Sequence, residues 1–236
     1  MSKKYKGKIC AYCCENESTK TGDHIFAREF FLNGERNNLP KVPACERCNN
    51  EKSNLEHYLT AVLPFGGSHG DAEENLRTLL PPRLEKNQRL RNEILNGSVF
   101  GASEETLEAI PLDGQAFVDF FTKASKGLSL YHWGDYIDPE TFAYSTCLTS
   151  TGVELIEERI FSLNAGKLIE NEIGARTISY RGVQAVDNSQ ISFWLFTIYG
   201  GLKVADAGTL SNTICTITAP NKIKDAILGV FNEASA

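Results

Sequence analysis

The chain has 236 residues, of which 42% are hydrophobic and 23% are charged, with a formal net charge of −6 at pH 7. This is the composition of an ordinary globular protein, and it excludes disordered, collagen-like and low-complexity chains. A chain of this length can bury enough surface to fold without disulfides. Its longest apolar run, residues 193–202, has ten residues, short of the roughly 18 that a membrane span needs. We therefore expect no membrane association.

The seven cysteines and the N-terminal sequence bear on the compartment. The sequence MSKKYKGK leads directly into a cysteine cluster and lacks the apolar segment of a secretory signal. Cysteines without an export signal favour a reducing compartment, in which thiols bind metal or are simply buried. The interpretation is a cytoplasmic protein. Cys147 and Cys215 lie in apolar, strand-like segments and are expected to be plain buried cysteines.

Charge is uneven along the chain. Residues 1–60 hold ten Lys or Arg and eight Asp or Glu, a net charge of +2, whereas the remainder holds fourteen and twenty-two, a net charge of −8. A basic footprint over the whole surface is absent, so any contact with DNA must be local. The acidic remainder is not expected to be the main DNA-binding surface.

Composition and periodicity divide the chain into three regions. Residues 1–65 hold five of the seven cysteines and two of the four histidines. Residues 66–113 have the pattern of a helical connector. Residues 114–236 are predicted to form an α+β domain of unknown function, with regulation, dimerisation and sensing as its candidate roles.

Hydrophobic spacing predicts the elements in chain order. Helices are expected at 71–80 and 83–96, with Pro81-Pro82 breaking or kinking the chain between them and Asn96-Gly97-Ser98 ending the second. Further helices are expected at 114–127, 153–163 and 222–231, and strands at 142–148, 177–186, 190–199, 202–207 and 213–219. Gly200-Gly201 is typical of a hairpin turn between two of these strands. The fold class is therefore α+β, with a C-terminal antiparallel sheet.

Two CxxC pairs carry the strongest signal in the sequence. They are Cys10-Ala11-Tyr12-Cys13 and Cys45-Glu46-Arg47-Cys48. A CxxC turn places two thiolates on one side of a tight knuckle, and two knuckles supply the four ligands of a structural zinc site. The 31 residues between the pairs exceed the roughly 15–20 of a simple four-cysteine finger, so a segment is inserted between them. Cys14 is a fifth thiol, either spare or an alternative ligand.

Two short polar stretches contain residue types that suit metal-assisted hydrolysis. The insert contains Gly22-Asp23-His24-Ile25, and the second knuckle continues into Asn49 and Asn50. Carboxylate and amide oxygens suit Mg²⁺ or Mn²⁺, and such a cation neutralises the charge that develops on a phosphate. A histidine can deprotonate the attacking water at neutral pH. On a β-strand Asp23 and His24 point to opposite faces, so one can bind metal while the other faces a water.

Taken in order, these pieces resemble the zinc-supported variant of the HNH endonuclease family over about residues 8–58. The resemblance implies a ββα-metal finger, treble-clef-like, in which a hairpin precedes a helix. It implies that His24 is the general base and that Asp23 and Asn49 hold a catalytic Mg²⁺ or Mn²⁺. Lys52, three residues after Asn49, would approach a phosphate. The structural zinc would lie away from the chemistry, on Cys10, Cys13, Cys45 and Cys48.

The hairpin loop departs from the family pattern. The family's loop Asn, which orients the histidine, usually lies about five residues before the second knuckle, and this chain has Pro40 there. Asn38 is the candidate for this role, with Asn37 as an alternative. Asn50 would replace Asn49 as the metal ligand if the helix began one residue later.

The start of the helix also has alternatives. Ser53-x-x-Glu56 fits a capping box, which predicts a helix start near residue 54 with residues 49–53 as a loop and Glu56 as a cap. Leu55, Tyr58, Leu59, Val62 and Leu63 keep a helical period in either case. His57 is either a further metal ligand or a surface residue.

Three functions follow from these patterns. The first is a metal-dependent HNH endonuclease acting on DNA, with RNA left open, similar to effectors of phage defence or mobile elements. The second is a non-catalytic zinc module that binds nucleic acid or protein. The third is a regulated toxin whose acidic C-terminal part restrains residues 1–65 or binds a partner. The C-terminal region is also the candidate surface for a homodimer or a regulatory partner.

Overall fold

The N-terminal unit is a hairpin followed by a helix. The computed structural model describes residues 3–15, 19, 21–100, 107–110, 112–162, 167–206, 209–211 and 213–235. Strand β1 (Thr21–His24) pairs antiparallel with β2 (Lys41–Ala44), and helix α1 (Glu46–Val62) follows. Single turns η1 (Lys3–Tyr5), η2 (Arg28–Phe30) and η3 (Asn33–Glu35) lie before and between the strands.

Helix α1 begins at Glu46, so the alternative start near residue 54 is wrong. Cys45 occupies the N-cap position, and its sulfur accepts a hydrogen bond from the backbone N–H of Cys48. This cap satisfies one of the N–H groups that the first helical turn leaves unpaired. Glu56 therefore lies inside the helix.

A run of short helices follows α1. They are η4 (Leu63–Gly66), α2 (Gly70–Glu74), the π-helical turn η5 (Asn75–Leu79), α3 (Leu80–Lys86) and α4 (Gln88–Gly97). Of the break or kink expected at Pro81-Pro82, the break is wrong, because the prolines occupy the first turn of α3, where a missing N–H is tolerated. The chain breaks instead at Asn87, whose side chain caps α4. Helix α4 ends at Gly97, as predicted.

The C-terminal half contains a five-stranded antiparallel sheet with the order β5-β11-β8-β7-β6. Its strands are β5 (Phe142–Leu148), β6 (Ile169–Ile173), β7 (Ile178–Gln184), β8 (Ser192–Ile198) and β11 (Thr213–Ala219). Two small hairpins pair β3 (Val99–Phe100) with β4 (Leu107–Ala109) and β9 (Val204–Asp206) with β10 (Thr209–Ser211).

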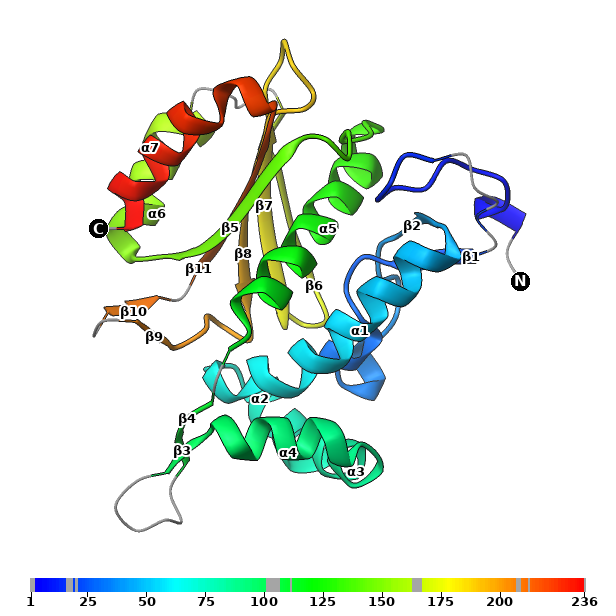
Figure 1. Cartoon of the computed structure of the whole chain (residues 1–236), viewed down its shortest axis with the longest axis vertical. Helices are drawn as coiled ribbons and strands as arrows, with labels where there is room; N and C mark the ends of the chain where they lie inside the picture. The colour runs from blue at the N-terminus through cyan, green and yellow to red at the C-terminus, as the bar shows by residue number, and fades with distance from the viewer. Residues whose placement is uncertain are drawn as a thin grey trace.

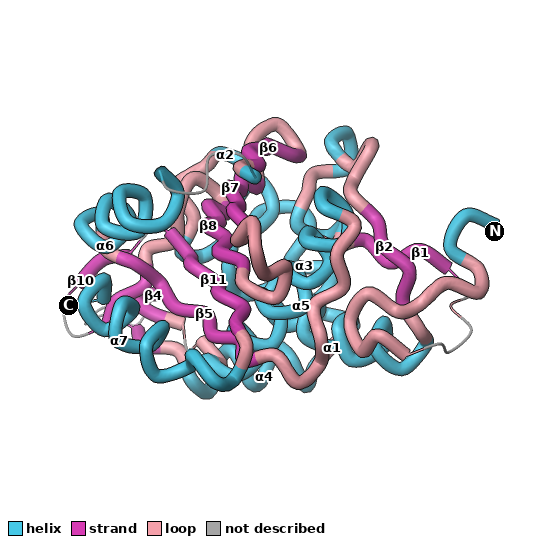
Figure 2. Tube along the Cα trace, turned by 90° about the horizontal axis from the view of Figure 1, so that it is seen from above, coloured by secondary structure: helices cyan, strands magenta, loops and turns pink. Residues whose placement is uncertain are grey.

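Helices cover both faces of this sheet. Helix α5 (Gly114–Trp133) lies on one face, and α6 (Ser150–Ile156), its continuation η6 (Glu157–Phe161) and α7 (Lys224–Ser235) lie on the other, with η8 (Asn221–Ile223) leading into α7. The paired strands β1 and β2 and helix α1 lie on the far side of α5 from the sheet (Figure 1). Figure 2 shows the same order of layers from above. In the described part of the chain, no helix is both long enough and apolar enough to cross a membrane.

The predicted C-terminal elements are largely confirmed. Strands 142–148 and 213–219 match β5 and β11 at both ends, whereas α5 runs on to Trp133 instead of ending at Gly127. Leu163 and Ala207, the last residues of two expected elements, lie outside the described residues. The hairpin predicted at Gly200-Gly201 is wrong, because β8 pairs with β7 and β11 while β9 pairs with β10.

One hydrophobic core joins the three regions. Ile25, Phe26 and Phe30, which follow β1, are fully buried together with residues of α5 and the sheet. The ring of Phe26 lies 6.4 Å from that of Phe120 on α5 and 6.1 Å from that of Phe196 on β8, between ring centroids. The hairpin that carries Asp23 and His24 is therefore anchored to the C-terminal half.

Candidate functional site

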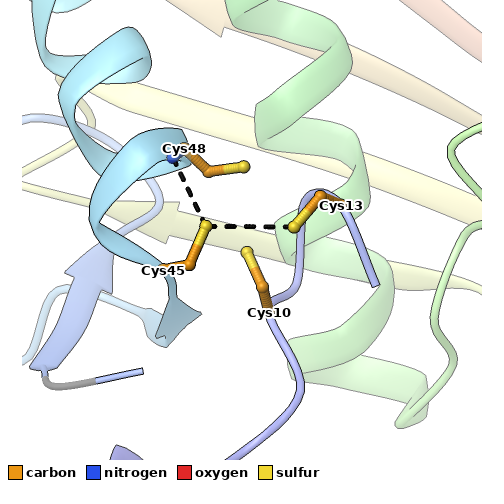
Figure 3. Close-up of side chains that lie close together, drawn as sticks. All are labelled: Cys10, Cys13, Cys45 and Cys48. Carbon is orange, nitrogen blue, oxygen red and sulfur yellow. Dashed lines mark hydrogen bonds between the residues drawn. The ribbon is translucent and has the colours of Figure 1, made fainter. Parts of the chain in front are cut away.

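Four cysteines converge at the start of α1 (Figure 3). Cys10 and Cys13 come from a turn before β1, while Cys45 caps α1 and Cys48 lies in its first turn. Their sulfur atoms all lie within 4.8 Å of one another, and Sγ of Cys13 is 3.9 Å from Sγ of Cys45. Tetrahedral zinc with Zn–S bonds of about 2.3 Å places its sulfurs about 3.8 Å apart. The cluster therefore fits a zinc ion.

Backbone hydrogen bonds hold the first knuckle in place. The N–H of Cys14 donates to the carbonyl of Cys10 at 3.0 Å and closes the turn. The N–H of Ala11 donates to the carbonyl of Pro43 at 2.8 Å, which ties the turn to β2. The first knuckle is thus held against β2, the strand that leads into the second knuckle.

The thiols of the cluster differ in their readiness to ionise. Burial raises the pKa of Cys45 and Cys48. Burial also acts to raise the pKa of Cys10, but hydrogen bonds from the backbones of Cys45, Cys13 and Tyr12 outweigh it and lower the pKa. Zinc binds the thiolate form, so a bound cation would stabilise the ionised sulfurs that burial alone disfavours.

Cys14 does not belong to the cluster. Its Sγ donates to the carbonyl of Ile137 at 3.3 Å, and burial raises the pKa of its thiol. Of the two possibilities left open by the sequence, the spare thiol is the one that agrees with this geometry.

Asp23 lies in a polar cluster between the hairpin and α1. The hydroxyl of Tyr12 donates to Oδ2 of Asp23 at 2.6 Å, and Nζ of Lys52 lies 3.2 Å from the same oxygen. Lys52 also forms an ion pair with Glu56 and donates to the carbonyl of His24 at 2.7 Å. The Lys52 side chain is 0% exposed, so it lies inside the protein and not at the surface position expected for a phosphate contact.

Burial shifts the pKa values of the groups around Asp23. It raises the pKa of Glu56 to about 7, with Asp23 adding to the shift and Lys52 opposing it. It also raises the pKa of Tyr12 well above its ordinary value, and the neighbouring Asp23 carboxylate reinforces this. At neutral pH Tyr12 is therefore a neutral hydrogen-bond donor.

His24 ends β1 on the opposite face from Asp23. The register pairs Asp23 with Val42, which is buried, and His24 with Lys41, which is exposed. Burial is the largest cause that lowers the pKa of His24, to about 4, and the charges of Lys41 and Arg28 add to it, while Asp23 opposes. The half-buried imidazole is therefore neutral at pH 7 and can accept a proton.

The candidate amide ligands differ in position. Asn49 is half-buried in the first turn of α1, and its N–H donates to the carbonyl of Cys45 at 3.0 Å. It lies three residues before Lys52 and shares a helix face with it, which is the face that meets Asp23. Asn50 is exposed.

The other sequence candidates lie at the surface. His57 and Asn37 are exposed. Asn38 is exposed as well, with a backbone φ of 57°, in the segment that leads to β2. Within the described residues no hydrogen bond joins Asn38 to His24, so the structure does not bring together the pair that the hairpin-loop interpretation requires.

Sequence reasoning missed three residues of this site, Tyr12, Arg28 and Lys41, and it assigned Glu56 to a helix cap instead of the interior of α1. Tyr12 lies inside the first CxxC, where the cysteines dominate the pattern. Lys41 becomes a neighbour of His24 only once the β1–β2 register is known. Spacing along a single strand does not supply that register.

Comparison with known proteins adds no family to this picture. The chain matches no family model, no curated protein and no solved structure. The likeness to HNH endonucleases therefore depends on the motif residues alone. The structure itself supplies a four-cysteine cluster beside a hairpin and a helix.

Proposed function

We propose that the chain is a metal-dependent endonuclease of the HNH type that hydrolyses phosphodiester bonds in DNA. The observation that carries the proposal is the arrangement of one ββα unit. Asp23 and His24 share β1, and Lys52 joins β1 to the face of α1 that also bears Asn49. This brings the Asp23 carboxylate to the helix face that bears the Asn49 amide, while the His24 imidazole projects from the opposite face of the same strand.

The cysteine cluster fits a structural role in this unit. Zinc on four thiolates has no open coordination position for chemistry. Bound there, it would fix the first knuckle to the start of α1, and thereby fix the hairpin relative to the helix. Cys45 and Cys48 are ligands in this interpretation and also the first residues of the helix that carries Asn49.

Asp23 and Asn49 form a donor set suitable for Mg²⁺ or Mn²⁺. Both Tyr12 and Lys52 contact Oδ2 of Asp23, and in the described part of the chain Oδ1 has no protein partner. Mg²⁺ is usually held by one or two protein oxygens together with waters and substrate phosphate oxygens. Its chemical contribution when bound would be to neutralise charge on the phosphate and the leaving oxygen.

His24 would act as the general base. Its imidazole is neutral at pH 7 and lies on the outward face of the hairpin, beside the exposed Lys41. There it can take the proton of a water that attacks the phosphorus. The carbonyl of His24 is held by Lys52, which fixes the backbone from which the ring projects.

A metal titration tests the proposed ligands. Nicking of supercoiled plasmid would be followed against Mg²⁺ concentration for the wild type, Asn49→Ala and the matched variant Asn50→Ala. We expect Asn49→Ala to need at least tenfold more Mg²⁺ and Asn50→Ala, which changes an exposed neighbour, to behave as the wild type. Equal titrations for all three proteins would remove Asn49 from the site.

One observation favours a second candidate, a zinc module that binds nucleic acid or protein without cutting. Oδ2 of Asp23 already has two donors, and Lys52 is buried against it, as a purely structural cluster would require. Such a module would bind zinc and show no metal-dependent cleavage. The plasmid assay separates the two functions.

A further inference from the structure

Lys41 stands opposite His24 on the outer face of the hairpin, and a second cation, Arg28, lies in the turn after β1. In the antiparallel register His24 stands directly opposite Lys41, and directly opposed residues project from the same face. The neighbouring pair, Asp23 and Val42, projects to the other face, where Val42 is buried. Lys41 is exposed, so its ammonium group stands on the solvent side of the hairpin, next to the His24 ring.

Arg28 is a second cation in the same part of the hairpin, in the turn after β1. It begins η2, four residues after His24, and is exposed. The charges of Arg28 and Lys41 both act on the His24 imidazole. The charges that act on the ring therefore come from both β2 and η2.

Among the described residues of this acidic chain, both cations lack an ion-pair partner. The chain carries a formal charge of −6, and several of its other exposed arginines are paired with carboxylates: Arg47 with Glu15, Arg77 with Glu74, and Arg176 with Glu172. Within the described residues, neither Lys41 nor Arg28 has a carboxylate within ion-pair distance. Unpaired cations grouped on one face attract a polyanion.

We propose that Lys41 and Arg28 bind two phosphates of the DNA backbone and hold the strand against His24. This proposal rests on the proposed nuclease function, because it assigns the substrate contacts of that site. Ammonium and guanidinium groups in this role position the backbone and read no base sequence. They take the role of phosphate contact that the resemblance assigned to Lys52 on α1, which is buried.

The salt dependence of binding tests the proposal. A fluorescein-labelled DNA duplex of random sequence would be titrated with protein by anisotropy at several NaCl concentrations, without Mg²⁺, Mn²⁺ or chelator. Each lost phosphate contact lowers the slope of log K against log salt by about 0.9. For Lys41→Gln with Arg28→Gln we expect the slope to fall by about 2 and the affinity at low salt to fall at least tenfold.

Two matched variants control for charge and for folding. Lys222→Gln removes an exposed cation in η8, beside α7 on the far side of the sheet, and should leave the slope unchanged. The charge-conserving pair Lys41→Arg with Arg28→Lys should keep the slope of the wild type.

The outcomes are distinct. A wild type that does not bind the duplex, or a double glutamine variant with the wild-type slope, would overturn the proposal. If Lys222→Gln lowers the salt slope as much as the double glutamine variant does, the proposal is overturned as well, because the loss would then reflect net charge alone. Binding that behaves as expected, without cleavage in Mg²⁺ or Mn²⁺, would support these contacts while the proposed nuclease function fails.

Discussion

Lys52 on α1 and Asp23 on β1 form a buried ion pair, with 3.2 Å between Nζ and Oδ2. The same ammonium group donates to the carbonyl of His24 at 2.7 Å. One side chain therefore connects the helix to both residues of the Asp-His pair. The relative placement of Asp23, His24 and α1 depends on this lysine, although it is not available to substrate.

Removing the charge of Lys52 should destabilise the protein strongly. Lys52→Met leaves the carboxylates of Asp23 and Glu56 in a buried cluster without a cation, and breaking such a cluster costs roughly 3–5 kcal/mol. Urea unfolding at pH 7 measures the loss. Lys86→Met, at an exposed position of α3, should change the free energy of unfolding by less than about 0.5 kcal/mol. Similar losses for the two variants would contradict the role of the buried cluster.

Glu56 should make stability depend on pH. Its pKa is about 7 in the folded protein against an ordinary value of 4.5, so the folded state holds this proton more tightly than the unfolded state. The resulting stabilisation is complete below about pH 4.5 and is lost as the pH rises through 7. Glu56→Gln has no such titration. Between pH 5 and pH 8, the free energy of unfolding of this variant should rise by on the order of 3 kcal/mol relative to that of the wild type.

The measurement for Glu56 is urea unfolding of both proteins at pH 5 and pH 8. The free energy of unfolding of the variant minus that of the wild type should be larger at pH 8 than at pH 5. A difference that is constant between the two pH values would show that Glu56 titrates in the folded protein as it does in the unfolded chain.

The cysteine cluster should hold one zinc ion per chain. Elemental analysis of protein purified without added metal measures the ratio. Cys48→Ser should lose most of the zinc and unfold at a lower temperature, because metal binding contributes directly to folding. Cys14→Ser should retain the zinc, since the Cys14 sulfur contacts Ile137 outside the cluster. Folded wild-type protein without zinc would contradict the site.

The shared core predicts that the chain unfolds as one unit. Phe26 packs against α5 and β8, so Phe26→Ala should cost about 3–5 kcal/mol. Zinc release and the fluorescence of Trp133 and Trp194 should change together during unfolding. Zinc release at a clearly lower urea concentration than the tryptophan change would mean that residues 1–65 are independent, as the regulated-toxin hypothesis requires.

Sequence reasoning reached the parts of the fold that local pattern determines. The CxxC spacing identified a cysteine group that the structure brings within 4.8 Å, and apolar alternation identified β5 and β11. Strand β6 was not predicted, because it lies at the edge of the sheet and its central residues, Glu170, Asn171 and Glu172, are polar and show no apolar alternation. The break predicted at Pro81-Pro82 was wrong because a proline interrupts a helix in its interior but is tolerated in its first turn, where these prolines lie.

The remainder of the site depends on contacts between distant segments. Lys52 has the sequence context of an exposed helical residue, and its burial follows from Asp23 on the hairpin and Glu56 one turn later. Lys41 joins His24 only through the register of β1 and β2. Spacing along a single sequence carries no information on either relationship.

Cleavage of supercoiled plasmid is the most direct test of the central claim. Wild type, His24→Ala and the matched variant His57→Ala, whose histidine is exposed on α1, would be incubated in Mg²⁺, in Mn²⁺ and without divalent cation. Metal-dependent nicking or linearisation by the wild type and His57→Ala, reduced at least about 100-fold in His24→Ala, is the predicted result. Cleavage that survives in His24→Ala, or zinc-loaded wild type that cuts in neither cation, would contradict the account.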